Sequence, residues 1–253
     1  MYYSIDEYII FNPDFNGELD GKIKTNIRKH TKLIFSNFSC IDEYYNIYIK
    51  KKGIYSNEIK IYKEKGYYNN FSYSESKFNK QIDHNLPSTI KYLKFGHSFN
   101  KTVDNLGSTL EEIIFGYEFN KQVDNLPFSI KSITFGYSFN QSVDNIPNSI
   151  IYLSLSYSFN KKLDDLPIGL ETLIIGKNFN HNINCLPKTL KFLEIKSKYY
   201  ADSLYVKKYL NICALPKNLE EITLHVDSYE KKIQKFNIDN IKYQFGKEKI
   251  FLY

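Results

Sequence analysis

Short alternations of apolar and polar residues recur along the middle of the chain and predict short β-strands. In Leu93-Lys94-Phe95 two apolar side chains flank a polar one, which is typical of a strand with one buried face. Equivalent trios follow at regular intervals. We therefore expect parallel strands stacked in sequence order, with the first and third residue of each trio facing inward. The expected strands are Leu93–Phe95, Ile113–Phe115, Ile133–Phe135, Leu153–Leu155, Leu173–Ile175 and Leu193–Ile195.

These trios belong to a longer repeat whose units share a Phe-Asn pair. Successive pairs are spaced by twenty positions, with one extra position in the first interval. An aliphatic residue stands four positions after each Phe, an Asp usually follows it, and Leu-Pro or Ile-Pro comes next. The pairs are Phe78-Asn79, Phe99-Asn100, Phe119-Asn120, Phe139-Asn140, Phe159-Asn160 and Phe179-Asn180.

The segment between two trios has the composition of a turn. Asp can bond to the backbone two residues further on, and Pro fixes its own φ and excludes a helix. A Gly follows most trios, where a Cβ would obstruct the bend of the chain. A lone unit buries too little apolar surface to offset the entropy of ordering its backbone, so the units must stack. The sequence thus predicts a mostly-β protein, a parallel β-solenoid with 20-residue repeats.

The shared positions resemble a known family, the FNIP repeat, which occurs in social amoebae and giant amoeba viruses. They also resemble the shortest leucine-rich repeats, because Ile90-Lys91-Tyr92-Leu93-Lys94-Phe95 has the strand signature of that class. The resemblance implies a leucine-rich-repeat-like solenoid that binds proteins and carries out no chemistry. Some relatives begin with an F-box that docks to ubiquitin-ligase machinery, and this sequence shows no convincing F-box.

The flanks of the repeat are irregular. We expect an N-terminal cap at residues 1–77, six repeats at 78–195, and an excursion with a degenerate repeat and a cap at 196–253. Residues 15–35 contain a degenerate copy of the repeat, with Phe15-Asn16 at its start. We further expect a strand at Ile59–Ile61 on the first good unit, a polar loop from Lys63 to Ser76 and a helical excursion from Tyr199 to Leu210.

The net charge of the chain changes these predictions little. The formal net charge is +6, yet residues 78–195 contain 11 Lys and 11 acidic residues. The repeat is therefore neutral, and we do not expect it to bind nucleic acid. No apolar stretch is long enough for a membrane span, and the N-terminus lacks the features of a signal peptide. Three unpaired cysteines, Cys40, Cys185 and Cys213, favour an intracellular and cytoplasmic location, in the host cytoplasm if the source is viral.

Polar columns along the stack are candidates for chemistry. We expect the Asn of each Phe-Asn pair to bond to turn backbone as an asparagine ladder. The Asp column at positions 83, 104, 124, 144 and 164 supplies too few oxygens for calcium, which takes about 6–8 ligands, so we expect turn capping. The five histidines stand at unrelated repeat positions. No catalytic motif or phosphate loop is present, so we expect neither an enzyme nor a cofactor or metal.

The candidate partner-binding residues lie on and beside the strands. Tyr117, Tyr137 and Tyr157 form a column just beyond the strands, and tyrosine is frequent in binding hot spots. The alternative is that these rings pack on the turn of the next unit, because the Gly before them interrupts the alternation. Outward positions of the strands complete the candidate set, namely Tyr152, Ile114 and Ile174.

These observations predict a protein-binding solenoid with a partner of unknown identity. Two alternatives remain open: a structural component of a virus particle or another assembly, and a substrate-binding adaptor of a ubiquitin ligase.

Overall fold

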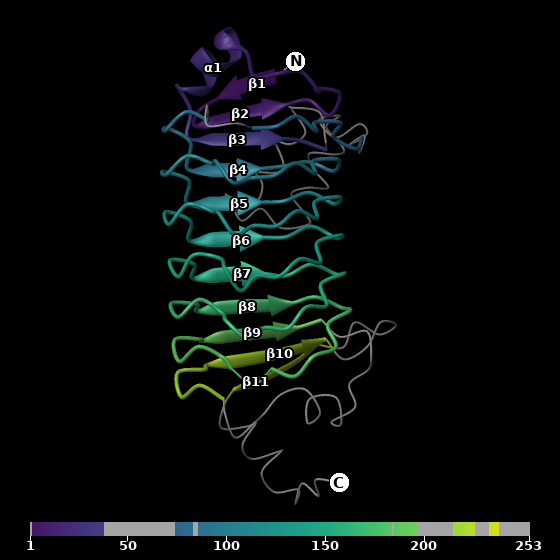
Figure 1. The fold of residues 1–253 in the computed structure, drawn as a ribbon, viewed down its shortest axis with the longest axis vertical. Helices are drawn as coiled ribbons and strands as arrows, with labels where there is room; N and C mark the ends of the chain where they lie inside the picture. Colours follow the sequence, from purple (N-terminus) through teal and green to yellow (C-terminus); the bar gives the residue numbers. More distant parts are fainter. Residues whose placement is uncertain are drawn as a thin grey trace, which may run out of the picture.

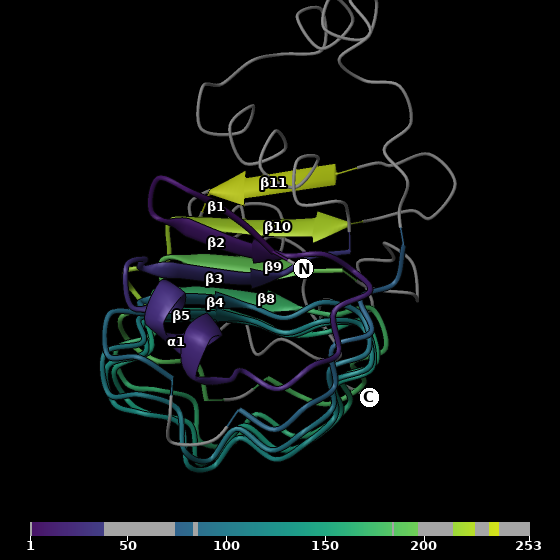
Figure 2. The same ribbon diagram turned by 90° about the horizontal axis from the view of Figure 1, so that it is seen from above.

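The chain forms one continuous sheet that runs the length of a solenoid. The computed structural model describes residues 2–37, 74–82, 86–183, 185–196, 215–225 and 233–237. Eleven strands pair in sequence order from β1 to β11 (Figure 1). Seen from above, the strands lie along one side and the return segments close the loop on the other (Figure 2). None of the helices within the described residues has the length and apolarity that a bilayer crossing requires.

The strands are short, as the sequence predicts. They are β1 (Tyr2–Ile5), β2 (Tyr8–Phe11), β3 (Lys32–Phe35), β4 (Tyr92–Lys94), β5 (Glu112–Ile114), β6 (Ser132–Thr134), β7 (Tyr152–Ser154), β8 (Thr172–Ile175), β9 (Phe192–Ile195), β10 (Glu221–His225) and β11 (Ile233–Asn237). Six of them, β4 to β9, were expected. Each begins one residue earlier than its trio, because the residue before the first apolar position already joins the ladder.

Parallel pairing in a constant register runs from β2 to β10. Leu93 lies beside Ile113, and Ile113 lies beside Ile133, so equivalent residues of successive units are neighbours. The predicted parallel order is therefore confirmed. The two end strands differ: β1 pairs antiparallel with β2, and β11 pairs antiparallel with β10. Each antiparallel strand closes the stack of parallel strands at its end.

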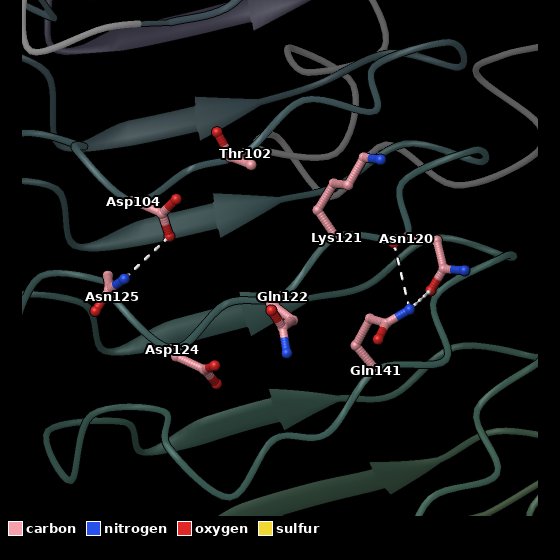
Figure 3. A pocket seen from close by; sticks show the side chains of 8 residues that line it. All are labelled: Thr102, Asp104, Asn120, Lys121, Gln122, Asp124, Asn125 and Gln141. Atoms are coloured by element: carbon pink, nitrogen blue, oxygen red, sulfur yellow. Dashed lines mark hydrogen bonds between the residues drawn. The ribbon is translucent and has the colours of Figure 1, made fainter.

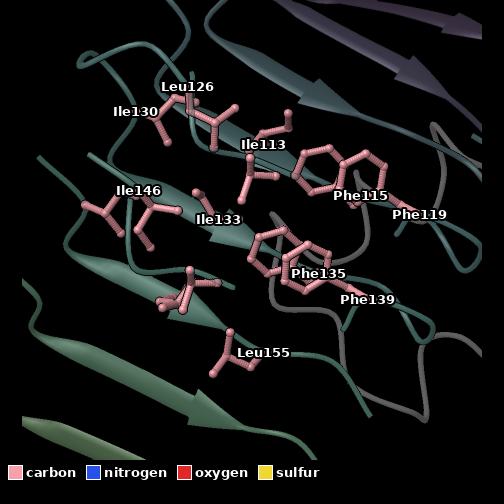
Figure 4. Close-up of a cluster of buried hydrophobic side chains, with 14 of the residues drawn as sticks. Ile113, Phe115, Phe119, Leu126, Ile130, Ile133, Phe135, Phe139, Ile146 and Leu155 are labelled. Carbon is pink, nitrogen blue, oxygen red and sulfur yellow. The ribbon is translucent and has the colours of Figure 1, made fainter. Parts of the chain in front are cut away.

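The core is built from the inward positions that the sequence predicts. The first and third residue of every expected trio are at most 5% exposed. The Phe of each Phe-Asn pair is buried as well. In four units it stacks on the Phe that ends the preceding strand segment, as Phe139 does on Phe135 at 3.6 Å between ring centroids. Before Phe159 and Phe179 that position holds Leu155 and Ile175. Figure 4 shows these paired rings in two successive units. The rings of the Phe-Asn pairs thus form one column through the six units. A second aromatic column lies beside it and ends at Phe135.

An asparagine ladder connects the units, as expected. The side-chain oxygen of Asn120 accepts a hydrogen bond from the backbone N–H of Asn140 at 2.9 Å, and the same bond links every Phe-Asn pair to the next. The ladder side chains are half-buried or exposed rather than fully buried.

Asn120→Ala is expected to lower the free energy of unfolding by about 1 kcal/mol, since a hydrogen bond contributes about 0.5–1.5 kcal/mol net. The substitution removes the acceptor of the Asn140 N–H. Urea unfolding of the variant measures the loss. The matched control is Asn105→Ala, at an exposed position outside the ladder. Equal losses for the two variants would show that the ladder carries no stability.

The degenerate repeat at residues 15–35 belongs to the same stack of parallel strands. β3 pairs directly with β4, and the backbone N–H of Asn79 bonds to the side-chain oxygen of Asn16 at 3.0 Å. β3 therefore occupies the position beside β4 where we expected a strand at Ile59–Ile61. Residues 59–61 themselves lie outside the described residues, as do Asp83, residues 63–73 and the excursion at 199–210. Helix α1 (Gly21–Ile27) lies at this end of the stack and buries Ile27 in the core (Figure 1).

Candidate functional site

The three candidate tyrosines stand at the corner that follows each strand. The backbone is held there by its own ladder: the N–H of Ser138 bonds to the carbonyl of Tyr117 at 2.9 Å, and that of Ser158 to the carbonyl of Tyr137 at 3.1 Å. Each tyrosine therefore repeats at the spacing of the strands. We call the column of Tyr117, Tyr137 and Tyr157 the tyrosine corner.

The rings of the tyrosine corner stack face to face. The ring centroids of Tyr117 and Tyr137 are 4.6 Å apart with an interplanar angle of 4°, and those of Tyr137 and Tyr157 are 4.6 Å apart at 13°. His97 extends the column at one end, with its ring 4.7 Å from that of Tyr117. The ammonium of Lys177 lies 5.8 Å from the centre of the Tyr157 ring at the other end. The column has five members from five consecutive units.

The stacked rings still present their edges to solvent. Tyr117 is 45% exposed and Tyr137 is 40% exposed, while Tyr157 is half-buried. Burial between its neighbours raises the pKa of the Tyr137 hydroxyl, and the hydroxyls of Tyr157 and Tyr117 add to this effect. The Tyr137 phenol is thus neutral at physiological pH. Each ring thus packs on the next unit with its face and reaches solvent with its edge, so the rings are neither fully packed away nor fully exposed.

The other three candidate residues are placed as expected but are not brought together. Ile114, Tyr152 and Ile174 all lie half-buried on the outer face of the sheet. Ile114 is on β5 and Ile174 is on β8, so three strand spacings separate them, about 14 Å. Burial raises the pKa of Tyr152, and the nearby Glu194 raises it further. This face is a mixed surface beside the tyrosine corner and not a single apolar patch.

A scan against family models identifies the repeat. The model described as FNIP Repeat matches residues 78–118, 102–138, 119–158 and 159–198. Residues 78–198 of this chain are FNIP repeats. Beyond the matched residues, β2, β3 and β10 continue the same parallel stack, so the solenoid extends further than the FNIP repeats at both ends.

A solved structure is also similar to this FNIP-repeat chain. It is described as "The crystal structure of CroV588 a novel circular LRR protein structure", and its sequence identity to this chain is 23%. The match covers 88% of this chain and 41% of that one, with a TM-score of 0.43. This chain therefore spans about two fifths of the length of that structure. No curated protein matches the chain.

The face opposite the sheet of the FNIP stack is polar. A groove of about 380 Å³ is lined there by residues of three units. Figure 3 shows the side chains that line it. Asp104 accepts a hydrogen bond there from the side chain of Asn125 at 3.3 Å, and Asp124 accepts one from Asn145 at 3.4 Å. Asp104 and Asp124 are thus each engaged by the following turn, whereas Asp144 bonds to Ser142 of its own turn. In the part of the chain that the structure describes, no three His, Cys, Asp or Glu side chains are grouped to hold a metal ion.

The sequence pattern did not predict two features of the surface. The outward residues Tyr8, Ile10 and Ile34 at the N-terminal end are buried. At the corner that precedes the strands, Phe128 and Ile168 are 82% and 73% exposed. The signal for the second feature was present, because both residues follow the Pro of their repeat, where Ser, Asn or Lys stands in other units.

Proposed function

We propose that this FNIP-repeat protein is a non-catalytic binding protein that recognises a protein partner through its tyrosine corner. The observation that carries the proposal is the column of face-to-face tyrosines at 4.6 Å spacing, of which Tyr117 and Tyr137 are exposed and Tyr157 is half-buried. Stacking holds each ring in one orientation before a partner arrives. A partner then loses little free energy to the ordering of these side chains.

The chemistry of the corner suits a protein surface. Tyrosine supplies a large apolar area together with a hydroxyl that donates and accepts hydrogen bonds, and it is enriched in binding hot spots. The outer sheet face continues the surface through Ile114, Ile174 and Tyr152, which serve as flanking contacts. Repeat proteins commonly bind through such an extended, regular surface.

The charge of the repeats favours a protein over a nucleic acid. Residues 78–195 carry equal numbers of Lys and acidic residues, so they offer no basic stripe for a phosphate backbone. We place the protein in the cytoplasm, in that of the host if the source is viral. The exposed thiol of Cys185 is compatible with a reducing compartment.

Replacing Tyr117, Tyr137 and Tyr157 together by serine is expected to reduce partner capture at least 10-fold. Loss of a hot-spot residue typically costs about 2 kcal/mol or more, and three are removed. The measurement is affinity capture from the native cell, quantified by mass spectrometry against the unmodified chain. The identity of the captured protein, a ligase subunit or a particle protein, then separates an adaptor from a structural component.

The matched control replaces three exposed lysines from the polar side of the same units. Lys101, Lys121 and Lys161 are each exposed and follow the ladder asparagine. Their joint change to serine is expected to leave capture unchanged. Circular dichroism and thermal melting verify that both triple variants are folded. Full capture by a folded tyrosine variant would exclude the tyrosine corner as the binding surface.

A further inference from the structure

The corner that precedes each strand carries a second ordered surface. It is a tight turn in which, for example, the N–H of Ile130 bonds to the carbonyl of Pro127 at 3.1 Å. The same bond recurs in the other units, including Leu219 N–H to Pro216 in the degenerate last unit. We call this turn the proline corner; it comprises residues 87–91, 107–111, 127–131, 147–151, 167–171, 187–191 and 216–220.

The last residue of each turn forms a straight column of side chains. From Glu111 onward, the backbone N–H of each member bonds to the carbonyl of the preceding member at 2.7–2.9 Å, as Lys131 does to Glu111. The N–H of Lys91 bonds in the same way to the carbonyl of the uncharged Thr31 at 2.8 Å, which precedes the first proline corner. All seven side chains are exposed or half-exposed. In order along the stack the column reads Lys91, Glu111, Lys131, Ile151, Glu171, Lys191 and Glu220.

This column is antisymmetric in charge about Ile151. Members at equal distance on the two sides of Ile151 carry opposite charge in every case: Lys131 and Glu171, Glu111 and Lys191, Lys91 and Glu220. A strip with this property is complementary to itself when it is turned by 180° about an axis through its centre. Isologous dimers are built on such self-complementary patches.

A second column of the proline corner has the same centre. The residue after each Pro is Phe128 in the third unit, Asn148 in the fourth and Ile168 in the fifth. Phe128 is 82% exposed and Ile168 is 73% exposed, so both apolar side chains stand in solvent. Rotation about an axis through the fourth unit places Phe128 of one copy against Ile168 of the other, and Asn148 against itself.

We propose that the proline corner binds a second copy of this chain in an antiparallel, two-fold symmetric dimer centred on the unit that holds Asn148 and Ile151. Ile151, which is 45% exposed, meets its own copy on the axis. Phe128 and Ile168 pack across the interface on both sides of it. The three pairs of opposite charge extend outward from this apolar centre.

Neighbouring registers are disfavoured by the same charges. An axis half a unit before Ile151 sets Glu111 against Glu171 and Lys91 against Lys191. An axis half a unit after it sets Lys131 against Lys191 and Glu111 against Glu220. A shift of one full unit places Lys131 against itself or Glu171 against itself. Like charges in contact across an interface are unfavourable, so the axis through Ile151 is selected.

The existing ion pairs within the chain are compatible with this dimer. Lys91 pairs with Glu111 at 2.8 Å, and Lys191 pairs with Glu171 at 3.0 Å. An ammonium has three donors and a carboxylate has several acceptor sites, so each group can take a further partner from the second copy. Six intervals of about 4.8 Å give the paired strip a length of about 29 Å. The tyrosine corner follows the strands, whereas the proline corner precedes them. The dimer therefore leaves the tyrosine corner of each chain accessible.

Sedimentation velocity of the full chain over a concentration series tests the proposal. The expected result is a monomer–dimer equilibrium that weakens as salt is added, because the outer contacts are charged. Phe128→Asp is expected to weaken dimerisation at least 10-fold. The variant should fold as the parent does, because Phe128 is almost fully exposed. A parent chain that stays monomeric at all concentrations overturns the proposal.

Charge exchange tests the register itself. Lys131→Glu brings a second carboxylate to Glu171 of the other copy, and Glu171→Lys brings a second ammonium to Lys131 of the other copy. Each single variant is therefore expected to dimerise at least 5-fold more weakly than the parent. An equimolar mixture of the two variants pairs opposite charges again at both contacts and is expected to recover the dimer. Recovery supports the axis through Ile151.

The matched control is Lys121→Glu, an equally exposed lysine on the polar side of the stack, which is expected to leave the dimer unchanged. Thermal melting verifies that every variant is folded. A dimer that is insensitive to Phe128→Asp, or single variants that do not recover on mixing, would place the interface elsewhere and refute the proposed pairing.

Discussion

Phe139→Ala is expected to lower the free energy of unfolding by about 3–5 kcal/mol, the usual cost of deleting a buried Phe side chain. The ring is fully buried and lies 6.0 Å from Phe119, 6.2 Å from Phe159 and 3.6 Å from Phe135, measured between centroids. A cavity at this position removes contacts in three units at once. Equilibrium unfolding in urea, monitored by circular dichroism, measures the change.

Tyr137→Ala, two residues before Phe139, is the control for this prediction. It removes an aromatic ring of similar size that is 40% exposed, so it should cost clearly less than Phe139→Ala. The ring of Tyr137 contacts tyrosines of two other units, and the control therefore also loses stacking. Equal losses of stability for the two variants would mean that the assignment of inward and outward positions is wrong.

Gly136→Ala is expected to cost about 1–3 kcal/mol by overpacking, although it adds a single methyl group. A Cβ on Gly136 would lie well inside van der Waals distance of the carbonyl oxygen and carbon of Gly116. Both atoms belong to backbone that is fixed by the ladders of strands and corners, so they cannot move away freely. The same close approach recurs between Gly116 and Gly96. Urea unfolding measures the loss.

Gly107→Ala provides the comparison within the same chain. A Cβ there has its nearest neighbour, the carbonyl oxygen of Leu86, at an ordinary 3.6 Å. The substitution reduces the entropy of the unfolded chain and is expected to be neutral or stabilising by up to about 1 kcal/mol. If Gly136→Ala were equally harmless, the corners would not approach each other as closely as the structure shows.

Ser156 shows how one unit accommodates a side chain in the glycine column. Its hydroxyl is buried and donates a hydrogen bond to the carbonyl of Phe139 at 2.6 Å. Alanine at position 136 has no such donor.

The constant period of the repeat made most of the fold predictable. Once Leu93, Ile113 and Ile133 are aligned by the repeat, parallel pairing in register follows, and so do the buried Phe column and the ladder of Asn side chains. Each of these depends on the same interaction in every unit. A regular sequence pattern therefore specifies a regular set of contacts.

Features that occur once, or that depend on direction, were not predictable in this way. The Gly at position 136 interrupts the alternation, so the sequence alone did not fix whether Tyr137 points outward or packs on its neighbour. Helix α1 and the antiparallel strands β1 and β11 lie outside the repeat and have no second copy for comparison. The antisymmetry of the proline corner became visible only when the structure placed Glu220 in line with Lys191.

The most direct test of the account is the distance between equivalent residues of different units. Two doubly spin-labelled variants are made in a chain whose native cysteines are replaced by serine. Gln81→Cys with Lys162→Cys spans four unit spacings, and Gln81→Cys with Asn182→Cys spans five. Each labelled variant is diluted with unlabelled protein. Pulsed electron–electron double resonance should give separations that correspond to about 19 Å and 24 Å between Cα atoms, at about 4.8 Å per unit. Broad distributions, or a shorter distance for the pair that is further apart in sequence, would contradict the stacked solenoid on which both proposed surfaces depend.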